Sequence, residues 1–425
     1  MGRKMKDSGV EWIGMIPSEW NVTSLKWLAS IQTGNTPSKN MQDVYYANEG
    51  IPWIKPENLG ENEAIRETAE YLTDAGAECA RIMPRNSVYV CCIGSVGKVG
   101  YSDKCCSCNQ QINAVIFNER MYWKFGYYMT IAQECEYGLY SNGNVVQIIN
   151  TTGQSDLKCP VPQINEQKLI VQTLDDKTKE IDSARRAIKR SIIEYQNIKQ
   201  SLITRAVTKG IWGEREMKDS GMDWLPELPI DWESIPAKYL FQNVDVRRLP
   251  DDERLTASQK YGIITQAEYM ERENAKVVTA TKNLSDWKHV EPNDFIISLR
   301  SFQGGLEMSE VSGCITWHYI VLRARRKVCH KFYKWLFKSS QYINALQGTC
   351  NFIRDGQDLR FSNFSQVPLY IPSLEEQEEI AAYLDEKCSA IDTLIAKKEQ
   401  LLSELEIYKK SLIYEYVTGK REVPA

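Results

Sequence analysis

An eight-residue motif occurs twice in this chain: MKDSGVEW at Met5–Trp12 returns as MKDSGMDW at Met217–Trp224. Further identities about 210 residues apart link residues 162–208 to residues 372–418, among them Pro162 with Pro372 and Gln167 with Gln377. This period is far longer than the roughly 20 to 50 residues of solenoid repeats. Each repeat is therefore expected to be a whole domain with an appended element. Such a duplicated chain predicts a ligand that also has two parts.

Size and charge place the chain among globular proteins. Its 425 residues, 43% of them hydrophobic, suffice for two or three cores. The net charge of -4 argues against a protein that coats nucleic acid by bulk charge, because such binders carry a basic excess. Only Arg185, Arg186, Lys189 and Arg190 form a dense basic run. No apolar stretch reaches the roughly 18 residues of a membrane span and no signal peptide is evident, so we expect a cytoplasmic protein without membrane contact.

The cysteines do not follow the repeat, since eight of the 12 lie between Cys79 and Cys159. A repeated disulfide framework is therefore excluded. Cys91 and Cys92 fall on an apparent strand, where they would point to opposite faces as reduced, buried thiols. Cys105 and Cys108 have zinc-ligand spacing, but no second CxxC follows and the second copy has no counterpart. We expect no metal site.

Each copy first mixes short β-rich runs with turns, which predicts a mixed α/β or α+β globule. Strands are expected at residues 87–93 and 114–117 in the first copy, and at residues 294–299 and 319–322 in the second. A polar, glycine-bearing turn follows at residues 94–98 and at residues 300–305. Each copy also begins with a tryptophan-containing segment, which we expect to clamp the chain onto its domain rather than to stack on bases. Its residues are Trp12, Pro17 and Trp20 in the first copy and Trp224, Pro229 and Trp232 in the second.

The last part of each copy has the heptad period of a coiled-coil helix. The expected seam is Leu174, Ile181, Ile188, Tyr195 and Leu202 in the first copy, and Leu384, Ile391, Leu405 and Leu412, with Lys398 between them, in the second. The expected alternate seam positions are Ala184 and Ile198, and Leu394, Leu401 and Tyr408. Each helix would be about 60 Å long at 1.5 Å per residue. An intramolecular coiled coil would bury both apolar stripes, and two separate partner-binding helices are the alternative.

Several short motifs occur in order along this framework. They are IPSEW at 16–20, TGNTP at 33–37, IPWIK at 51–55, GKVG at 97–100, NQQINA at 109–114, and the helix leads VPQINEQ at 161–167 and IPSLEEQ at 371–377. With these motifs, the twofold alternation of variable globule and heptad helix resembles the DNA specificity subunits of type I restriction-modification systems. The resemblance covers essentially the whole chain.

The resemblance implies a mixed α/β fold of two target-recognition domains separated by two long antiparallel coiled-coil helices, with an internal pseudo-twofold repeat. The expected segments are residues 1–160 and 214–370 for the two recognition domains, and residues 161–213 and 371–425 for the two helices. Each domain would read one half of a bipartite, asymmetric DNA site. The second domain lacks the PWIK and NQQIN runs and has Thr316–Tyr319 (TWHY) near the place of the latter. Two different half-sites are therefore expected.

The resemblance also implies the partners. The helices would set the spacing between half-sites and dock two modification subunits, which carry S-adenosylmethionine and methylate adenine at N6. Restriction subunits would join to form an endonuclease that depends on ATP and Mg²⁺. The chain itself would bind double-stranded DNA but no cofactor.

The sequence lacks the motifs of an autonomous enzyme. It has no Pro-Pro dipeptide for a flipped-base pocket, and residues 94–98 (GSVGK) are too short for a phosphate-binding loop. The three histidines, His289, His318 and His330, all lie in the second copy, so no catalytic histidine is duplicated. We predict no catalytic residue.

DNA reading requires polar side chains that meet base edges, from loops that also hold phosphates. In the first domain the candidates are Thr33, Lys39, Lys55, Asn58, Ser95, Lys98, Asn109, Gln110, Gln111, Asn142, Asn144 and Gln147. In the second they are Arg247, Arg248, Thr265, Gln266, Arg300, Ser301, Gln303, His318, Asn351, Arg354 and Gln357. Asn and Gln between strands also form turns with their own backbone, so part of this set is expected to be structural.

Two other functions are compatible with the same chain. One is a scaffold or decoy whose helices occupy modification subunits while its globules read nothing. The other is a stand-alone DNA enzyme with an unrecognised site.

Overall fold

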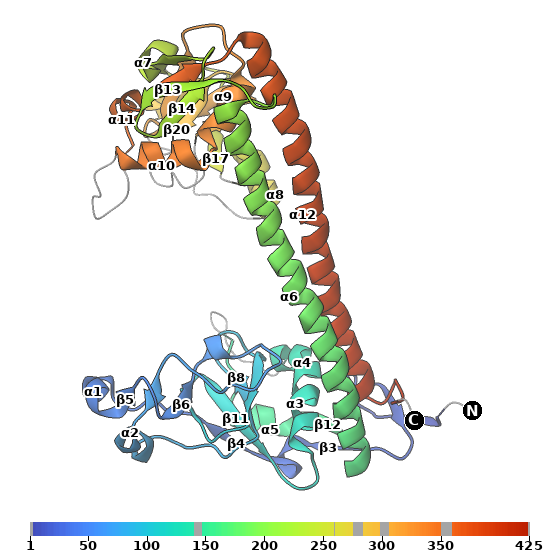
Figure 1. The fold of residues 1–425 in the computed structure, drawn as a ribbon. Coiled ribbons are helices and arrows are strands. Elements are labelled where there is room, and N and C mark those ends of the chain that lie inside the picture. Colours follow the sequence, from blue (N-terminus) through green and yellow to red (C-terminus); the bar gives the residue numbers. More distant parts are fainter. Residues whose placement is uncertain are drawn as a thin grey trace. The chain divides into compact units, whose positions relative to one another are not determined.

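The chain forms two compact units in a computed structural model that describes residues 3–139, 147–258, 260–274, 284–297, 306–349 and 359–423. Unit 1 comprises Met1–Arg190 and Glu399–Ala425, and unit 2 comprises Ser191–Lys398. Two long helices, α6 (Ile164–Lys209, 46 residues) and α12 (Leu374–Val417, 44 residues), are drawn in Figure 1. The first part of α6 and the last part of α12 belong to unit 1, and the remaining parts belong to unit 2. Among the described residues, no helix is long and apolar enough to span a membrane.

Unit 1 is built on an antiparallel sheet of order β4-β11-β8-β9. Its strands are Ala29–Thr33, Ile112–Phe117, Ser87–Cys91 and Val99–Ser102. Val88, Val90 and Val115 face a core that also contains α3 (Trp123–Ala132) and both long helices, whereas the alternating Tyr89 and Cys91 face a smaller core. A second sheet has the order β10-β6-β7-β5, with strands Ser107–Cys108, Ile51–Ile54, Tyr71–Leu72 and Tyr46–Ala47.

Unit 2 repeats this plan with the order β16-β23-β20-β21, again antiparallel throughout. The strands are Phe241–Val244, Ile320–Ala324, Phe295–Ile297 and Glu307–Met308. The pairs β17 (Leu255–Ser258) with β18 (Gly262–Thr265), and β19 (Lys288–Val290) with β22 (Gly313–Ile315), lie beside this sheet. Helices α9 (His330–Phe337), α10 (Ser340–Gly348) and α11 (Phe361–Gln366) contribute to its aromatic-rich core. The prediction of strands in the four segments is confirmed within the described residues.

The duplicated motif begins a hairpin in each unit. β1 (Met5–Asp7) pairs with β2 (Met15–Pro17), and β13 (Met217–Met222) pairs with β14 (Leu225–Pro229). Each domain is then closed by a strand pair that joins its beginning to its end: β3 (Asn21–Ser24) with β12 (Lys158–Val161), and β15 (Glu233–Ile235) with β24 (Leu369–Ile371).

The tryptophans that begin each copy are anchors, as predicted. Trp20 and Trp232 are fully buried, and their indole Nε1 atoms donate to Glu166 (2.9 Å) and Glu376 (2.8 Å), respectively, in the first turn of the long helix of the same unit. Arg3 and Arg215 pair with the same two carboxylates. A buried indole that has its hydrogen-bond partner contributes packing and orientation together, so each domain is fixed to its helix in the same way.

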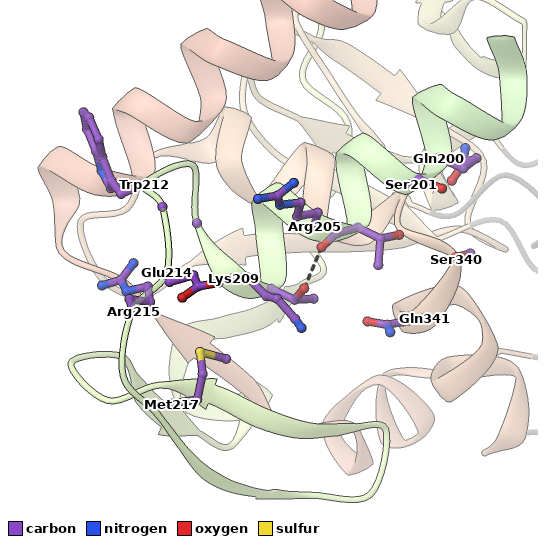
Figure 2. A pocket seen from close by; sticks show the side chains of 14 residues that line it. Gln200, Ser201, Arg205, Lys209, Trp212, Glu214, Arg215, Met217, Ser340 and Gln341 are labelled. Carbon is purple, nitrogen blue, oxygen red and sulfur yellow. Dashed lines mark hydrogen bonds between the residues drawn. The ribbon is translucent and has the colours of Figure 1, made fainter.

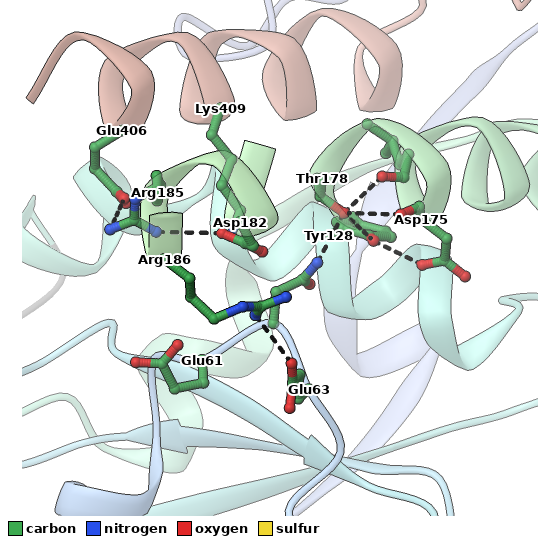
Figure 3. Close-up of polar contacts among 12 residues, drawn as sticks. Glu61, Glu63, Tyr128, Asp175, Thr178, Asp182, Arg185, Arg186, Glu406 and Lys409 are labelled. Carbon is green, nitrogen blue, oxygen red and sulfur yellow. Dashed lines mark hydrogen bonds and ion pairs between the residues drawn. The ribbon is translucent and has the colours of Figure 1, made fainter. Parts of the chain in front are cut away.

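The long helices pair antiparallel within each unit. In unit 1, Asp182 of α6 accepts from Lys409 of α12 at 2.8 Å, and Arg185 lies 2.7 Å from Glu406 (Figure 3). In unit 2, Lys199 of α6 donates to Asp392 of α12 at 2.6 Å. Lys199 and Lys409, like Asp182 and Asp392, stand 210 residues apart in the numbering, so one ion pair occurs in both units.

The predicted heptad seam has the correct period but the wrong alternate positions. Leu174, Ile181, Leu384 and Leu412 are buried, and Ile188, Tyr195, Leu202, Ile391 and Leu405 are half-buried. However, the expected alternate positions Ala184, Ile198, Leu394, Leu401 and Tyr408 are all exposed. The residues four positions after the seam positions are buried or half-buried instead, with Ile192, Cys388 and Lys409 among the buried ones.

All described cysteines are free thiols. Cys91 and Cys92 are both buried and belong to different cores, which confirms that they point to opposite faces of the sheet. Burial raises the pKa of Cys92 to about 11 and that of Cys108 to about 12. Across the described ranges no cluster of His, Cys, Asp or Glu has the arrangement of a metal site.

Candidate nucleic-acid interface

In unit 1, strand pairing brings most of the predicted DNA-contact residues to one end of the main sheet. β4 ends at Thr33 opposite Asn113, and β8 ends at Cys91 opposite Ile112, where β11 begins. Asn109 N donates to Ile54 O (3.1 Å), so Lys55, which follows β6, reaches the same end. Gly94 N donates to Gln147 O (3.0 Å), which adds Gln147 to this group. We call this the first recognition end.

A glycine permits the closest approach within this end. A Cβ atom on Gly34 would lie 2.2 Å from the carbonyl oxygen of Cys108, a distance that real Cβ contacts do not reach. The bare backbone instead lets Gly34 N donate to Ile112 O (2.9 Å) and Asn35 N donate to Cys108 O (2.9 Å). The TGNTP motif therefore docks its loop onto the start of the NQQINA motif.

Several candidates at the first recognition end have structural partners. Thr33 Oγ1 donates to Asn113 Oδ1 (2.8 Å), Asn58 Oδ1 accepts from Lys55 N (2.9 Å), and Asn109 Oδ1 accepts from Gln111 N (3.1 Å). Lys98 Nζ donates to Pro56 O at 3.0 Å. Ser95, Gln110 and Gln147 are exposed, although Gln110 Oε1 also accepts from Thr36 Oγ1. The expectation that some polar residues shape the turns agrees with these contacts, while DNA contact stays a prediction.

In unit 2 the equivalent end is the second recognition end. β16 ends at Val244 opposite Val321, and β20 ends at Ile297 opposite Ile320, where β23 begins. Arg247 and Arg248 follow β16 and His318 precedes β23, so these candidates share one end. Arg247 Nη1 donates to Asp286 O at 2.9 Å, and Lys288 Nζ donates to Tyr319 O at 2.9 Å.

Thr265 and Gln266 lie where α8 (Gln266–Glu273) begins. Thr265 Oγ1 caps the helix by accepting from Glu268 N at 3.2 Å. The remaining candidates lie outside the described residues: Asn142 and Asn144 in the first domain, and Arg300, Ser301, Gln303, Asn351, Arg354 and Gln357 in the second.

Sequence reasoning missed two side chains at these ends. Trp317 is 51% exposed and stacks on His318, with ring centroids 3.5 Å apart and an interplanar angle of 26°. Its signal was the TWHY run, from which only the histidine was selected. Glu70 was also missed, because it reaches Lys39 and Lys55 only through the fold.

The two recognition ends share a topology and differ in chemistry. The first presents lysines and amides, and the second presents arginines with a stacked indole and imidazole. The two ends therefore present different hydrogen-bonding groups and different apolar surfaces.

A family model described as "Type I restriction modification DNA specificity domain" matches residues 17–192 and again residues 229–406. The chain belongs to this family. Each match includes one of the two recognition ends. The two matches therefore agree with the duplication that the repeated MKDSG motif indicated.

Other members of the specificity-domain family are similar over part of their length. The putative MjaX specificity subunit of Methanocaldococcus jannaschii is 26% identical over 65% of this chain and 62% of its own length. The HindI specificity subunit of Haemophilus influenzae is 30% identical over 35% of this chain and 33% of its own length. The matches thus span less than two thirds of these relatives. A solved chain from a study of complex assembly and conformational transition of the type I R-M system has a TM-score of 0.69 at 14% identity, covering 96% of this chain and 99% of its own. That likeness shows the fold alone.

A cavity of about 840 Å³ lies in unit 2 between the end of α6, residues 210–217 and the start of α10 (Figure 2). Arg205, Lys209, Trp212 and Gln341 are among its lining residues. Among the described residues, no DNA-contact candidate lines this cavity.

Proposed function

We propose that the chain is the DNA specificity subunit of a type I restriction-modification complex, in which each recognition end reads one half of a bipartite, asymmetric sequence. The observation that carries this proposal is the pair of sheet ends with the same topology and different polar side chains, in a chain that the family model matches twice. A duplicated scaffold with divergent loops suits a ligand whose two halves differ.

Within each recognition end, some side chains would contact bases and others would bind phosphates. Arg and Lys match guanine, Asn and Gln match adenine, and apolar groups meet the thymine methyl, whereas contacts to phosphates fix position without sequence information. Exposed Gln110 and Gln147 in the first end, and Arg247 with His318 in the second, are the proposed readers. Because the chain is slightly acidic, we expect its isolated binding to be weak and the assembled complex to supply most of the affinity.

The long helices would set the spacing of the half-sites and dock two modification subunits. The recurrence of the Trp–Glu anchor and of the Lys–Asp pair supports two near-equivalent docking surfaces. The modification subunits would bring S-adenosylmethionine and methylate adenine N6, and restriction subunits would bring ATP and Mg²⁺. In this proposal the chain performs no catalysis and acts in the cytoplasm, where the DNA is.

A domain exchange tests the proposal. Residues 1–160 are replaced by the first recognition domain of another family member, α6 and α12 are kept, and N6-methyladenine is mapped in cells that also express the modification partner. One half-site should change while the other half-site and the spacer stay the same. An unchanged methylation pattern would favour the scaffold or decoy, and methyl transfer by the purified chain alone would favour the stand-alone enzyme.

A further inference from the structure

Lys55 of the first recognition end shares one carboxylate oxygen with a second lysine, Lys39. Lys39 Nζ lies 2.9 Å from Glu70 Oε2, and Lys55 Nζ lies 3.1 Å from the same atom. Lys39 begins a short 3₁₀ helix, Lys55 follows β6, and Glu70 precedes β7. Three separate segments thus place two ammonium groups around one anionic oxygen.

Two buried aromatic rings lie close to the ammonium groups of these lysines. Lys39 Nζ lies 3.9 Å from the centroid of Tyr46 and 4.9 Å from that of Trp53, and Lys55 Nζ lies 5.0 Å from that of Trp53. The rings meet edge to face, at 5.1 Å and 64°. Ring faces attract cations, so both ammonium groups are held in place before any ligand arrives.

The burial of the rings assigns their role. Trp53 and Tyr46 are buried, and Tyr46 OH donates to Pro37 O at 2.7 Å. A buried ring offers no face on which a base could stack, which excludes base stacking here. The part of the cluster that solvent reaches consists of exposed Lys39 and half-buried Lys55 and Glu70.

We propose that Lys39 and Lys55 form a clamp for one backbone phosphate of the DNA duplex, and that Glu70 occupies this clamp until the phosphate displaces it. The inference rests on the proposed function, since it needs DNA as the ligand. A phosphate oxygen between two ammonium groups gains the charge-assisted hydrogen bonds that Glu70 Oε2 has in the unbound chain. The hydrogen bond from Lys39 lowers the pKa of Glu70, so the placeholder is charged at neutral pH.

Two consequences follow. The clamp positions the duplex without reading it, because phosphates are the same in every sequence. Because a phosphate must displace Glu70, each binding event also breaks an existing ion pair. This lowers the affinity for all DNA sequences equally. The clamp thus adjusts overall affinity and leaves the preference for the half-site to other residues.

The test uses Glu70→Gln in the full chain assembled with its modification partner. Affinity is measured from about 50 to about 200 mM salt, where phosphate contacts make binding depend steeply on salt. The ligands are a duplex with the recognition site and one with both half-sites scrambled. We expect Glu70→Gln to raise both affinities by roughly two- to fivefold, the range of an exposed ion pair, with their ratio unchanged. Lys39→Gln and Lys55→Gln should lower both affinities and reduce the slope of log K against log salt by about 0.9 for each phosphate that is no longer neutralised.

A matched control lies in the same domain. Asp156 pairs with Lys26 at 3.1 Å, and Lys26 lies just before β4, opposite the first recognition end, so Asp156→Asn should leave both affinities unchanged. The clamp is refuted if Glu70→Gln leaves affinity unchanged, or if it changes the ratio of specific to scrambled binding. Circular dichroism checks the fold of each variant. Lys39→Gln, which keeps the Lys55–Glu70 pair, provides an independent test of the clamp.

The outcomes separate the two proposals. If Glu70→Gln has no effect while the exchange of residues 1–160 changes a half-site, only the clamp fails. If the wild-type complex binds the specific and the scrambled duplex equally, the proposed function fails.

Discussion

Trp317 exposes half of a large apolar ring just before β23, where it stacks on His318 at the second recognition end. Such a ring suits contact with a thymine methyl or with sugars, because it has a broad apolar face and its stacking on His318 keeps it in one orientation. An indole carries no charge, so its contribution to DNA binding would depend little on salt.

Replacing Trp317 by Ala should therefore lower DNA affinity with little change in the stability of the fold. Since the side chain is exposed, we expect the free energy of unfolding to change by no more than about 0.5 kcal/mol. DNA affinity of the assembled complex should fall about fivefold, which corresponds to a loss of about 1 kcal/mol of binding free energy. Fluorescence anisotropy with a labelled site duplex measures this.

Trp27 provides the control for this substitution. It is 60% exposed, but it precedes β4 and so lies opposite the first recognition end. Trp27→Ala should leave DNA affinity unchanged. Equal losses in the two variants would show that exposed tryptophans in general, rather than the second recognition end, account for the effect.

The cysteines give a second prediction for single residues. Cys79, Cys105 and Cys135 are exposed, whereas burial raises the pKa of Cys92 to about 11 and that of Cys108 to about 12. Thiolates react, and these buried thiols stay protonated at about pH 8, so the exposed three should be alkylated first. Brief treatment with iodoacetamide followed by peptide mass spectrometry measures this order, and denaturant should abolish it. Early labelling of Cys108 in the native chain would contradict the buried position of the residue that precedes NQQINA.

The residues that sequence reasoning could predict are those whose signal is duplicated or local. Trp20 and Trp232 were recognisable as anchors because the same motif precedes each. Glu70 was not, because its partners Lys39 and Lys55 come from segments that meet only through the pairing of β6, β7 and β5. Trp317 stood next to a selected residue, but a tryptophan in sequence is more often buried than exposed, and only the structure shows which.

At the scale of elements, the long helices were predictable in extent and period but not in the phase of their seam. Seam residues seven positions apart have a second seam residue between them, which follows the first either by three positions or by four. Ile198 and Tyr408 favoured the first spacing, yet they are 54% and 50% exposed. The structure uses the second, which places Lys199 and Lys409 at the seam, where each reaches a carboxylate of the other helix. A pattern of hydrophobic residues cannot indicate seam positions that polar residues occupy.

These two lysines provide a matched experiment on helix pairing. The Lys409 side chain is 10% exposed and its partner Asp182 is 16% exposed, while Lys199 and Asp392 are 23% and 55% exposed. Lys409→Met should lower the free energy of unfolding by about 3 kcal/mol, because Asp182 keeps Arg185 but loses its buried partner. Lys199→Met should cost no more than about 1 kcal/mol.

The measurement is unfolding in guanidinium chloride, followed by circular dichroism. Adding Asp182→Leu to Lys409→Met should restore much of the lost stability, since replacing both members of a buried pair with apolar groups is far less costly than removing one. Equal effects of Lys409→Met and Lys199→Met would contradict the assignment of the more buried pair to unit 1.

At the scale of the whole molecule, the repeat could be predicted but the composition of the compact units could not. Divisions along the sequence, such as residues 1–160 and 161–213, treat each helix as one piece. The units instead divide both helices, between Arg190 and Ser191 in α6 and between Lys398 and Glu399 in α12. Each recognition domain thus shares a unit with the start of one helix and the end of the other, an arrangement that requires long-range packing and has no local signal.

This division shows where a change in spacing can be introduced. Four residues inserted in α6 after Arg190 add about 6 Å of helix, at 1.5 Å per residue, and leave the contacts inside each unit untouched. If the helices set the spacer, a matched insertion in α12 after Lys398 is also needed, because otherwise the Asp182–Lys409 and Lys199–Asp392 pairs cannot both form. Mapping N6-methyladenine should then show a spacer longer by roughly two base pairs, at about 3.4 Å per step, with both half-sites unchanged. The insertion in α6 alone should methylate less efficiently than the matched pair, because one Lys–Asp pair must break. Altered bases within either half-site, or an unchanged spacer in the matched variant, would contradict the role of the helices as the spacer.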